Sequence, residues 1–230
     1  MNKIFSKAAF IIVLLSILTF TSNVDAQVYI RSIGISGGMY SPSMDYWSEN
    51  ALSSWSDEFG SSPFGNVNIE LNVVTYMNVR LGVGYWSQAL TQGNITFGNE
   101  LRSDEITLQM LPVNFDILAR TDEDFSPKFG LYGGIGAAVN FVTLKYSTSI
   151  PSLGTFEEEH SGRDLFGHLI LGADYLIMDT FAIGAEVRYV FGRYQQQEYD
   201  SNGNIFGNNV SIDGAQFMAT FKYVFCGCED

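Results

Sequence analysis

The segment Gln216–Phe225, with the sequence QFMATFKYVF, alternates between apolar and polar side chains without a break. A period of two residues predicts a β-strand, and we place the last strand of the chain at Val210–Phe225. One face of this strand carries an amide, a hydroxyl and an ammonium group. The other face carries Phe217, Ala219, Phe221, Tyr223 and Phe225. A soluble sandwich buries such an apolar face, whereas a membrane-spanning barrel turns it toward lipid, so alternation alone does not separate the two.

The opposite end of the chain favours the membrane. Lys3 and Lys7 precede an apolar run, Ala8–Phe20, which has the length of a signal-peptide core and is too short for a spanning helix. Small residues at positions 24 and 26 form the pattern of a cleavage site before Gln27. We therefore expect residues 1–26 to be a cleaved signal peptide. The alternative, an uncleaved N-terminal anchor, stays open.

Composition fits one exported β domain, residues 27–225. The chain has 23 glycines, 14% aromatic residues and only 16% charged residues, which is typical of neither a helical nor a disordered protein. A net charge of -13 argues against nucleic acid as a partner. The two cysteines, Cys226 and Cys228, lie in a short tail, 226–230, which we expect to be periplasmic and whose role stays open. No cofactor and no metal site are expected.

Seven further segments alternate in the same way. With the last one they predict an all-β fold, an eight-stranded antiparallel up-and-down transmembrane β-barrel that follows an N-terminal signal peptide. The seven segments are Ser32–Tyr40, Asn66–Val73, Val79–Trp86, Glu105–Ala119, Lys128–Lys145, Arg163–Tyr175 and Phe181–Gly192. No later segment is long and apolar enough for a membrane helix, and a closed barrel is the other structure that lipid admits.

The expected connections alternate in length, as they do in outer-membrane barrels with short periplasmic turns and long outer loops. Short turns are expected at 76–78, 121–127 and 177–180, and long loops at 41–63, 88–104, 147–162 and 196–209. Within Glu105–Ala119 the alternation changes phase beside Pro112. Because proline cannot donate to a strand ladder, this phase change predicts a β-bulge.

Three segments carry a resemblance to a known group of proteins. They are Leu111–Val113, Lys128–Gly136 and Gly172–Tyr175 with its continuation Glu186–Tyr189. With them, the whole mature chain resembles the small outer-membrane β-barrels of the porin-like superfamily that includes OmpW, OmpX and the OmpA barrel domain. The ending Phe221, Tyr223 and Phe225 also resembles the C-terminal signal read by the barrel assembly machinery. The resemblance implies a Gram-negative outer membrane, with lipid and lipopolysaccharide as surroundings, but no single function.

Charged residues of both signs fall on the faces expected to point into the lumen. They are Glu70, Arg80, Asp116, Lys128, Asp174, Glu186, Arg188 and Lys222. The interior of an eight-stranded barrel is just wide enough for side chains to fill it. We expect these charges to pair with one another and to hold the barrel rigid, because an unpaired buried charge is costly. A gated narrow pathway past Glu186, Arg188 and Lys222 is the alternative.

The long outer loops offer a second candidate site. In the first loop, Trp47, Trp55 and Phe59, with Ala51 between the two tryptophans, follow a spacing of four residues among acidic neighbours, which indicates a short amphipathic helix. These aromatics could anchor the loop in the membrane interface or bind an apolar solute. In the third loop, Glu157–Glu159 is expected to be a solvated acidic run.

We expect a structural or accessory outer-membrane protein, with limited passage of small or hydrophobic solutes as one option. The alternative is a surface adhesin or ligand-binding protein that acts through its acidic and aromatic outer loops. A lipid A-modifying enzyme is the third hypothesis, because some similar barrels use a histidine with serine or acidic partners. Here the candidate bases are His160 and His168, with Asp174 on the same face as His168. We expect no enzyme.

Overall fold

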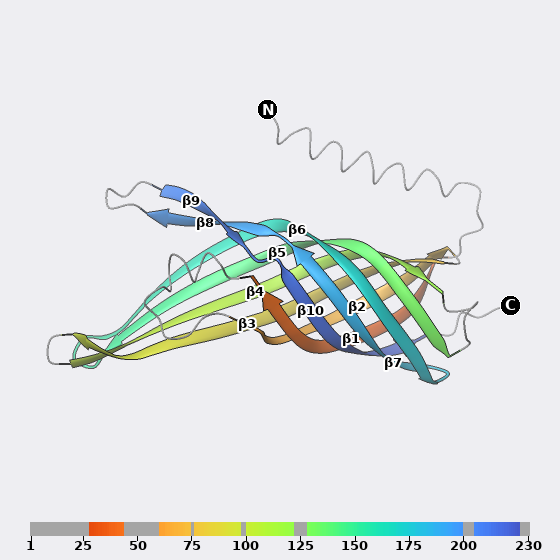
Figure 1. Ribbon diagram of the computed structural model, residues 1–230, viewed down its shortest axis with the longest axis horizontal. Helices are drawn as coiled ribbons and strands as arrows, with labels where there is room; N and C mark the ends of the chain where they lie inside the picture. Colours follow the sequence, from red (N-terminus) through yellow and green to blue (C-terminus); the bar gives the residue numbers. More distant parts are fainter. Residues whose placement is uncertain are drawn as a thin grey trace, which may run out of the picture.

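The computed structural model describes residues 28–43, 60–74, 76–97, 100–121, 128–199 and 205–225. In the described part, eight strands close into an antiparallel barrel in the order β1-β10-β7-β6-β5-β4-β3-β2 (Figure 1). The barrel strands are β1 (Tyr29–Pro42), β2 (Ser62–Val74), β3 (Met77–Phe97), β4 (Glu100–Arg120), β5 (Phe129–Ile150), β6 (Gly154–Met178), β7 (Phe181–Phe191) and β10 (Gly214–Val224). The predicted fold class is confirmed.

Closure is made by β1, which pairs with β10 on one side and with β2 on the other. Every other barrel strand pairs with its neighbours in sequence, apart from one additional hairpin. That hairpin, β8 (Arg193–Tyr199) and β9 (Ile205–Ser211), extends beyond both ends of the predicted fourth long loop, 196–209, so this loop and the predicted start of the last strand at Val210 are wrong. Each barrel strand is thus paired on both sides along the barrel, which removes the open edges that lipid cannot satisfy.

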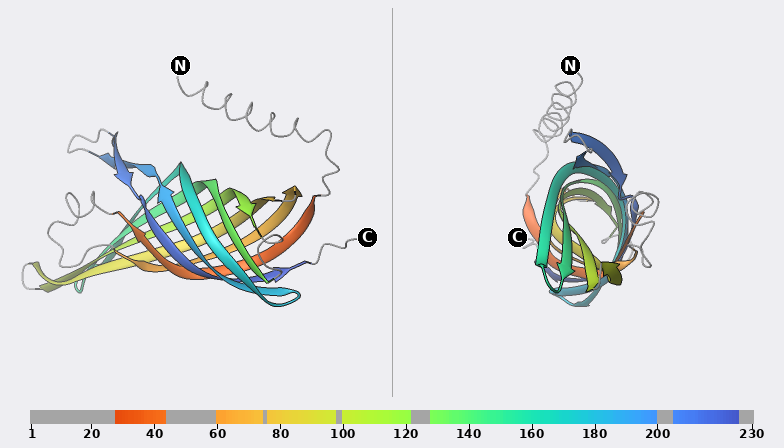
Figure 2. Two further views of the ribbon diagram at one scale, coloured as in Figure 1. Left: turned by 45° about the vertical axis from the view of Figure 1, so that its right-hand side comes forward. Right: turned by 90° about the vertical axis from the view of Figure 1, so that its left-hand side faces the viewer.

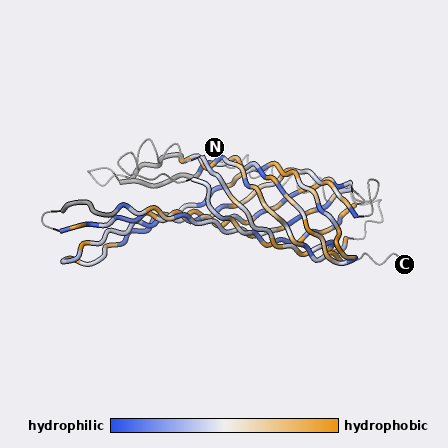
Figure 3. Tube along the Cα trace, turned by 60° about the horizontal axis from the view of Figure 1, so that its bottom comes forward, coloured by the Kyte–Doolittle hydropathy of each residue, from blue (hydrophilic) through white to orange (hydrophobic). Residues whose placement is uncertain are grey.

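Hydrophobic and hydrophilic positions alternate along the barrel strands (Figure 3). The apolar positions point outward: Ile35, Leu171 and Phe217, for example, are 57%, 67% and 58% exposed. The interleaved positions point into the lumen and are buried. This arrangement shows that the apolar face of Gln216–Phe225 points outward, as it does in a membrane-spanning barrel.

The predicted bulge beside Pro112 is wrong. The register between β4 and β5 runs without a shift through Leu111, Pro112 and Val113, and even-numbered residues of β4 face inward from Ile106 to Arg120. The hydropathy pattern changes phase because the inward-facing side chains are apolar in one part of the lumen and charged in another. Ile106 and Met110 point inward where the lumen is apolar, and Asp116 points inward where it is ionic.

Two of the predicted long loops, 88–104 and 147–162, are wrong as well. β3 and β4 continue through the first of these segments to Phe97 and Glu100, and β5 and β6 through the second to Ile150 and Gly154. Together the continuations form a projecting sheet, which we define as residues 87–97, 100–110, 142–150 and 154–165 (Figure 2). The turn between β5 and β6 spans only residues 151–153, followed by Gly154 with a φ of 89°.

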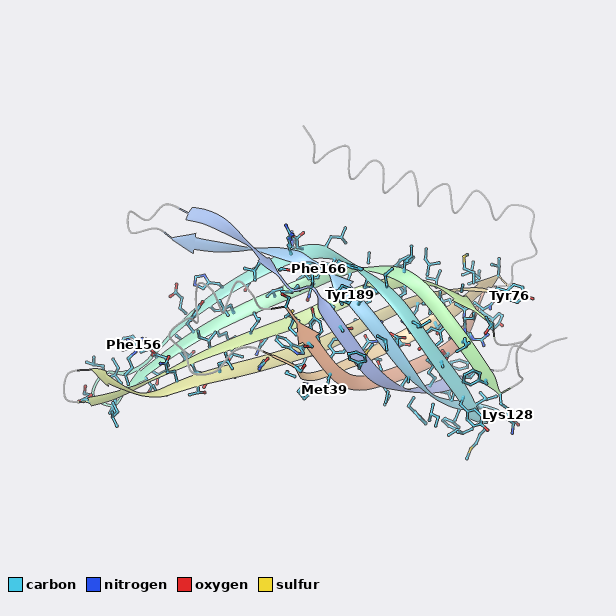
Figure 4. The ribbon with its side chains drawn as sticks, in the orientation of Figure 1. Met39, Tyr76, Lys128, Phe156, Phe166 and Tyr189 are labelled. Carbon is cyan, nitrogen blue, oxygen red and sulfur yellow. The ribbon has the colours of Figure 1, made fainter. Side chains whose placement is uncertain are left out.

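The barrel therefore has two unlike ends. We call the end with the short connections, near Tyr76 and Lys128, the turn end; the first and last strands also begin and end there (Figures 1 and 4). The other is the sheet end, from which the projecting sheet extends to the region of Phe156. Most of the first long loop, residues 44–59, lies outside the described residues.

Candidate functional site

Seven of the eight charged residues predicted to face the lumen lie inside it, each at most 7% exposed. They come from six strands: Glu70 from β2, Arg80 from β3, Asp116 from β4, Asp174 from β6, Glu186 and Arg188 from β7, and Lys222 from β10. The eighth, Lys128, is an exposed turn residue just before β5. Lys128 instead borders a cavity at the turn end.

Arg80 is the centre of the first ionic cluster. Its guanidinium donates two hydrogen bonds across the lumen to Glu186, at 2.6 and 3.1 Å, and a third to Asp116 at 2.8 Å. Arg188 donates to the other side of Glu186 at 3.0 Å and lies 3.5 Å from Asp116. A bidentate guanidinium–carboxylate pair is a strong and directional hydrogen-bonded arrangement, so β3, β4 and β7 are linked through the interior.

Arg120 is the centre of the second cluster. It donates to Glu70 at 3.0 Å and to Asp174 at 2.7 Å. Lys222 donates to Asp174 at 2.7 Å and lies 3.7 Å from Glu70. Asn78 also donates to Glu70, at 2.5 Å. Sequence reasoning missed Arg120 because the predicted strand ended at Ala119, although continued alternation from Asp116 would have placed it inward.

Tyr132 joins the two clusters. Its hydroxyl donates to Glu186 at 2.9 Å. The nitrogen of Lys222 lies 4.5 Å from the centre of its ring, and the guanidinium carbon of Arg120 lies 4.8 Å from it, both within cation–π range. We call the ring and the charges around it the ionic layer: Glu70, Arg80, Asp116, Arg120, Tyr132, Asp174, Glu186, Arg188 and Lys222. Its four acidic and four basic residues balance.

Glycines on the inward faces make room for this layer. A β-carbon added at Gly172 would lie 2.3 Å from the ring of Tyr132, and one at Gly136 would lie 2.4 Å from Asp116. The strands can therefore carry large charged or aromatic side chains at some inward positions only because neighbouring positions have no side chain.

Toward the sheet end the lumen is filled by apolar side chains. We call this group the apolar layer: Tyr40, Phe64, Trp86, Leu90, Ile106, Leu108, Met110, Val142, Leu144, Phe166, Val190, Val210, Ile212 and Met218. Trp86 and Leu108 are fully buried. The Tyr40 ring packs edge-on against Trp86 at 5.8 Å, and its hydroxyl donates to the carbonyl of Ile212. Two dissimilar layers thus occupy successive levels of the barrel.

The cavities that remain in the lumen are small. One of about 130 Å³ lies at the turn end, between Arg31, Lys128 and Leu176, and one of about 20 Å³ lies where the ionic and apolar layers meet. The residues that separate them, such as Asp174 and His168, belong to or contact the ionic layer. The described part of the barrel is therefore packed rather than open.

The two histidines have different surroundings. His168 is 3% exposed, and its Nε2 lies 2.6 Å from Asp116, not beside Asp174 as the shared face suggested. His160 lies in the projecting sheet, 3.0 Å from Glu158. Among the described residues, no group of three or more His, Cys, Asp or Glu side chains could hold a metal ion. His168 serves here as a partner of the first cluster.

The C-terminal aromatics lie on the outer wall at the turn end. Phe221, Tyr223 and Phe225 are 43%, 40% and 36% exposed. Phe181 stacks on Phe221 at 5.7 Å and meets Tyr223 edge-on at 5.4 Å. The second predicted site, Trp47, Trp55 and Phe59, lies outside the described residues, as do Cys226 and Cys228.

A closed antiparallel barrel with a wall of exposed aliphatic and aromatic side chains, and with charges confined to its interior, is stable only when lipid covers the wall. The chain therefore folds as a small transmembrane β-barrel. No helix among the described residues is long and apolar enough to cross a membrane.

Three solved structures illustrate the likeness of the fold. Neisserial surface protein A is 10% identical, with 86% of this chain and 99% of that chain covered and a TM-score of 0.49. A major outer membrane protein from Thermus thermophilus is 14% identical, covering 86% and 100%, with a TM-score of 0.49. Ail, the attachment invasion locus protein of Yersinia pestis, is 14% identical, covering 85% and 98%, with a TM-score of 0.47. Neither a protein-family model nor a curated protein sequence matches the chain.

The orientation of this barrel can be tested with single cysteines, in a background where Cys226 and Cys228 are replaced by serine. Leu153, in the turn of the projecting sheet, is 60% exposed, and Tyr76, at the turn end, is 51% exposed. We expect Leu153→Cys to react with a membrane-impermeant maleimide on intact cells, and Tyr76→Cys to react only after the outer membrane is opened, because long connections face outward. The reverse labelling pattern would show that the turn end faces the outside of the cell.

Proposed function

We propose that this protein is a closed membrane anchor that presents the projecting sheet at the cell surface for binding to a partner. The observation that carries the proposal is the difference between the barrel part of the strands and their continuations. The lumen is filled by the ionic and apolar layers, whereas β3, β4, β5 and β6 continue well beyond the barrel (Figures 1 and 2). A filled lumen supports an anchor, and an exposed sheet supports recognition.

The edge of the projecting sheet supports binding by strand addition. β6 begins at Gly154, but its ladder with β7 begins only at Gly167. Over the preceding residues no strand pairs with this side of β6 in the described part of the chain, although β8 lies in contact with β6. Such an edge offers backbone donors and acceptors to an extended peptide. Phe156, at 57% exposure, would add an apolar contact.

Charge narrows the class of partner. The projecting sheet carries seven acidic and three basic residues, and Glu157, Glu158 and Glu159 are consecutive and exposed on β6. Lys145 offsets part of this run through a 3.5 Å contact with Glu159. A sheet of this charge attracts cationic segments and repels anionic ones, more strongly at low salt. The partner we propose is therefore an extended, basic protein segment.

Binding can be measured with the full-length protein in nanodiscs and an immobilised lysine-rich peptide as the probe. We expect the variant Glu157→Gln/Glu158→Gln/Glu159→Gln to weaken binding by about tenfold or more, and added salt to weaken binding to the unmodified protein. Asp179→Asn, which removes a charge at the turn end, is the control and should bind as the unmodified protein does. Equal binding by all three proteins would contradict recognition through the sheet.

Passage of solutes through the lumen is the competing hypothesis. Trp86 and the ionic layer fill the cross-section of the lumen at two successive levels. Passage of a solute would therefore require both to move. We expect no persistent channels when the purified protein is inserted into planar bilayers, since an eight-stranded barrel has no room for an aqueous pore beside its side chains. Stable unitary conductance that survives shortening of the first loop would show an open lumen and would end the anchor proposal.

Export is part of the same proposal. The positive N-terminus, the apolar run Ala8–Phe20 and the small residues before Gln27 support removal of residues 1–26 during secretion. N-terminal sequencing of the protein isolated from outer membranes should show that the mature chain begins at Gln27.

A further inference from the structure

Five buried polar side chains converge where the ionic layer meets the apolar layer. Trp86, Asn114, Asn140, Arg188 and Gln216 all line the cavity of about 20 Å³, and each is at most 4% exposed. They come from five strands: β3, β4, β5, β7 and β10. We call these five residues the junction pocket.

Each of the five residues has a polar atom without a hydrogen-bond partner among the residues that the structure describes. Three are donors: the indole Nε1 of Trp86, the amide Nδ2 of Asn114 and the Nε of Arg188. Two are acceptors: the Oδ1 of Asn140 and the Oε1 of Gln216. Buried polar groups are rarely left without partners, because their hydration is lost and nothing replaces it.

The neighbouring side chains do not supply the missing partners. Arg188 already uses another nitrogen on Glu186, and the amide nitrogen of Asn140 faces the sulfur of Met110 at 3.7 Å, a weak acceptor. Two other polar residues line the pocket, but the Tyr40 hydroxyl donates to Ile212 and the Nε2 of His168 contacts Asp116. A partner inside the pocket could therefore serve the five atoms.

We propose that the junction pocket is a binding site for a water molecule. A space of about 20 Å³ is large enough for one water. Water donates two hydrogen bonds and accepts two, so one molecule can serve the amide oxygens of Asn140 and Gln216 and, at any time, two of the three N–H groups. A cation is disfavoured by the donors, and an anion by the two acceptor oxygens.

This site gives the lumen a third component between its two layers. The apolar layer cannot hydrate the Arg188 guanidinium, and the carboxylates of the ionic layer reach its other side. The bound water connects the amide side chains to the first cluster without a direct contact. In this way the barrel carries polar groups up to the edge of its apolar layer without leaving them unsatisfied.

The test uses the full-length protein with ¹⁵N-labelled tryptophan in nanodiscs. The indole N–H signal of Trp86 is assigned by its loss in Trp86→Phe. We expect a cross-relaxation peak between this N–H and water, and we expect the peak to weaken several-fold in Asn140→Leu/Gln216→Met. Gln109→Met, on the outward face of β4, is the control and should keep the peak. Migration of unheated protein on a gel reports whether each variant is folded.

Two results would overturn the proposal. The first is the lack of a water peak at Trp86 in the folded, unmodified protein, because this measurement needs no variant other than the one used for assignment. The second is a Trp86 signal that shifts in a saturable way when nitrate is replaced by chloride, since the pocket would then hold an anion with the amide groups of Asn140 and Gln216 turned around.

Discussion

Replacing Arg80 with methionine should lower the free energy of unfolding by about 3–5 kcal/mol, the cost of breaking a buried ion pair from one side. The change keeps much of the side-chain volume but removes the three hydrogen bonds to Asp116 and Glu186. Glu186 would keep Arg188 and Tyr132 as partners, whereas the lumen would carry one uncompensated negative charge. Urea unfolding in detergent, followed by the gel shift between folded and unfolded barrel, measures the loss.

The matched control is Arg102→Met. Arg102 donates a 2.6 Å hydrogen bond to Asp104 in the projecting sheet, but its side chain is 35% exposed. Exposed ion pairs contribute little because water and salt screen them, so this variant should unfold like the unmodified protein. If the two variants lose the same stability, the ionic layer does not hold the barrel together.

Replacing Gly172 with alanine should cost about 1–3 kcal/mol of unfolding free energy, as overpacking of a filled interior does. The added methyl group would meet three atoms of the Tyr132 side chain at 2.3, 2.4 and 2.7 Å. Tyr132 has little space to withdraw, because its hydroxyl is bonded to Glu186 and its ring faces Arg120 and Lys222. Displacement of the ring would thus disturb both ionic clusters at once.

Gly167→Ala is the control on the same strand. A methyl group there would meet only the carbonyl oxygen of Gly136, at 4.0 Å. This variant should keep the stability of the unmodified protein or gain slightly, because alanine narrows the conformations of the unfolded chain. A second variant, Gly172→Ala/Tyr132→Phe, separates steric from polar effects. It should remain unstable, since the clash with the ring carbons persists. A Gly172→Ala protein as stable as Gly167→Ala would contradict the tight packing around Tyr132.

Alternation predicted the barrel strands, and the apolar N-terminal run and the lengths of the connections then indicated which of their faces points outward. In Gln216–Phe225 each side chain faces either lipid or lumen, and the two surroundings differ so strongly that the local pattern reports them. The same reasoning failed within β4, where Ile106 and Met110 are apolar and yet point inward. There the local pattern has the opposite sense, because the inward face meets the apolar layer and the outward face, with Thr107 and Gln109, belongs to the projecting sheet. The predicted bulge at Pro112 came from this reversal.

The ends of the strands were also beyond the reach of the pattern. In the projecting sheet, residues such as Glu157–Glu159 have water beside them whether they form a strand or a loop. Nothing in their hydropathy separates these states, so the predicted loops 88–104 and 147–162 were wrong. Whether such a segment forms a strand or a loop depends on pairing with a neighbouring strand, and pairing depends on two segments rather than one.

The sequence by itself determined that this protein has an exterior of apolar side chains around an interior of mixed charges, because strand periodicity assigns each residue to a face. Only the tertiary structure decided which charges meet. Arg80 and Glu186 are 106 residues apart and lie on strands that do not pair, so their contact depends on how the closed barrel brings opposite walls together. The same closure brings Tyr132 between the two clusters and the five polar residues of the junction pocket around one cavity.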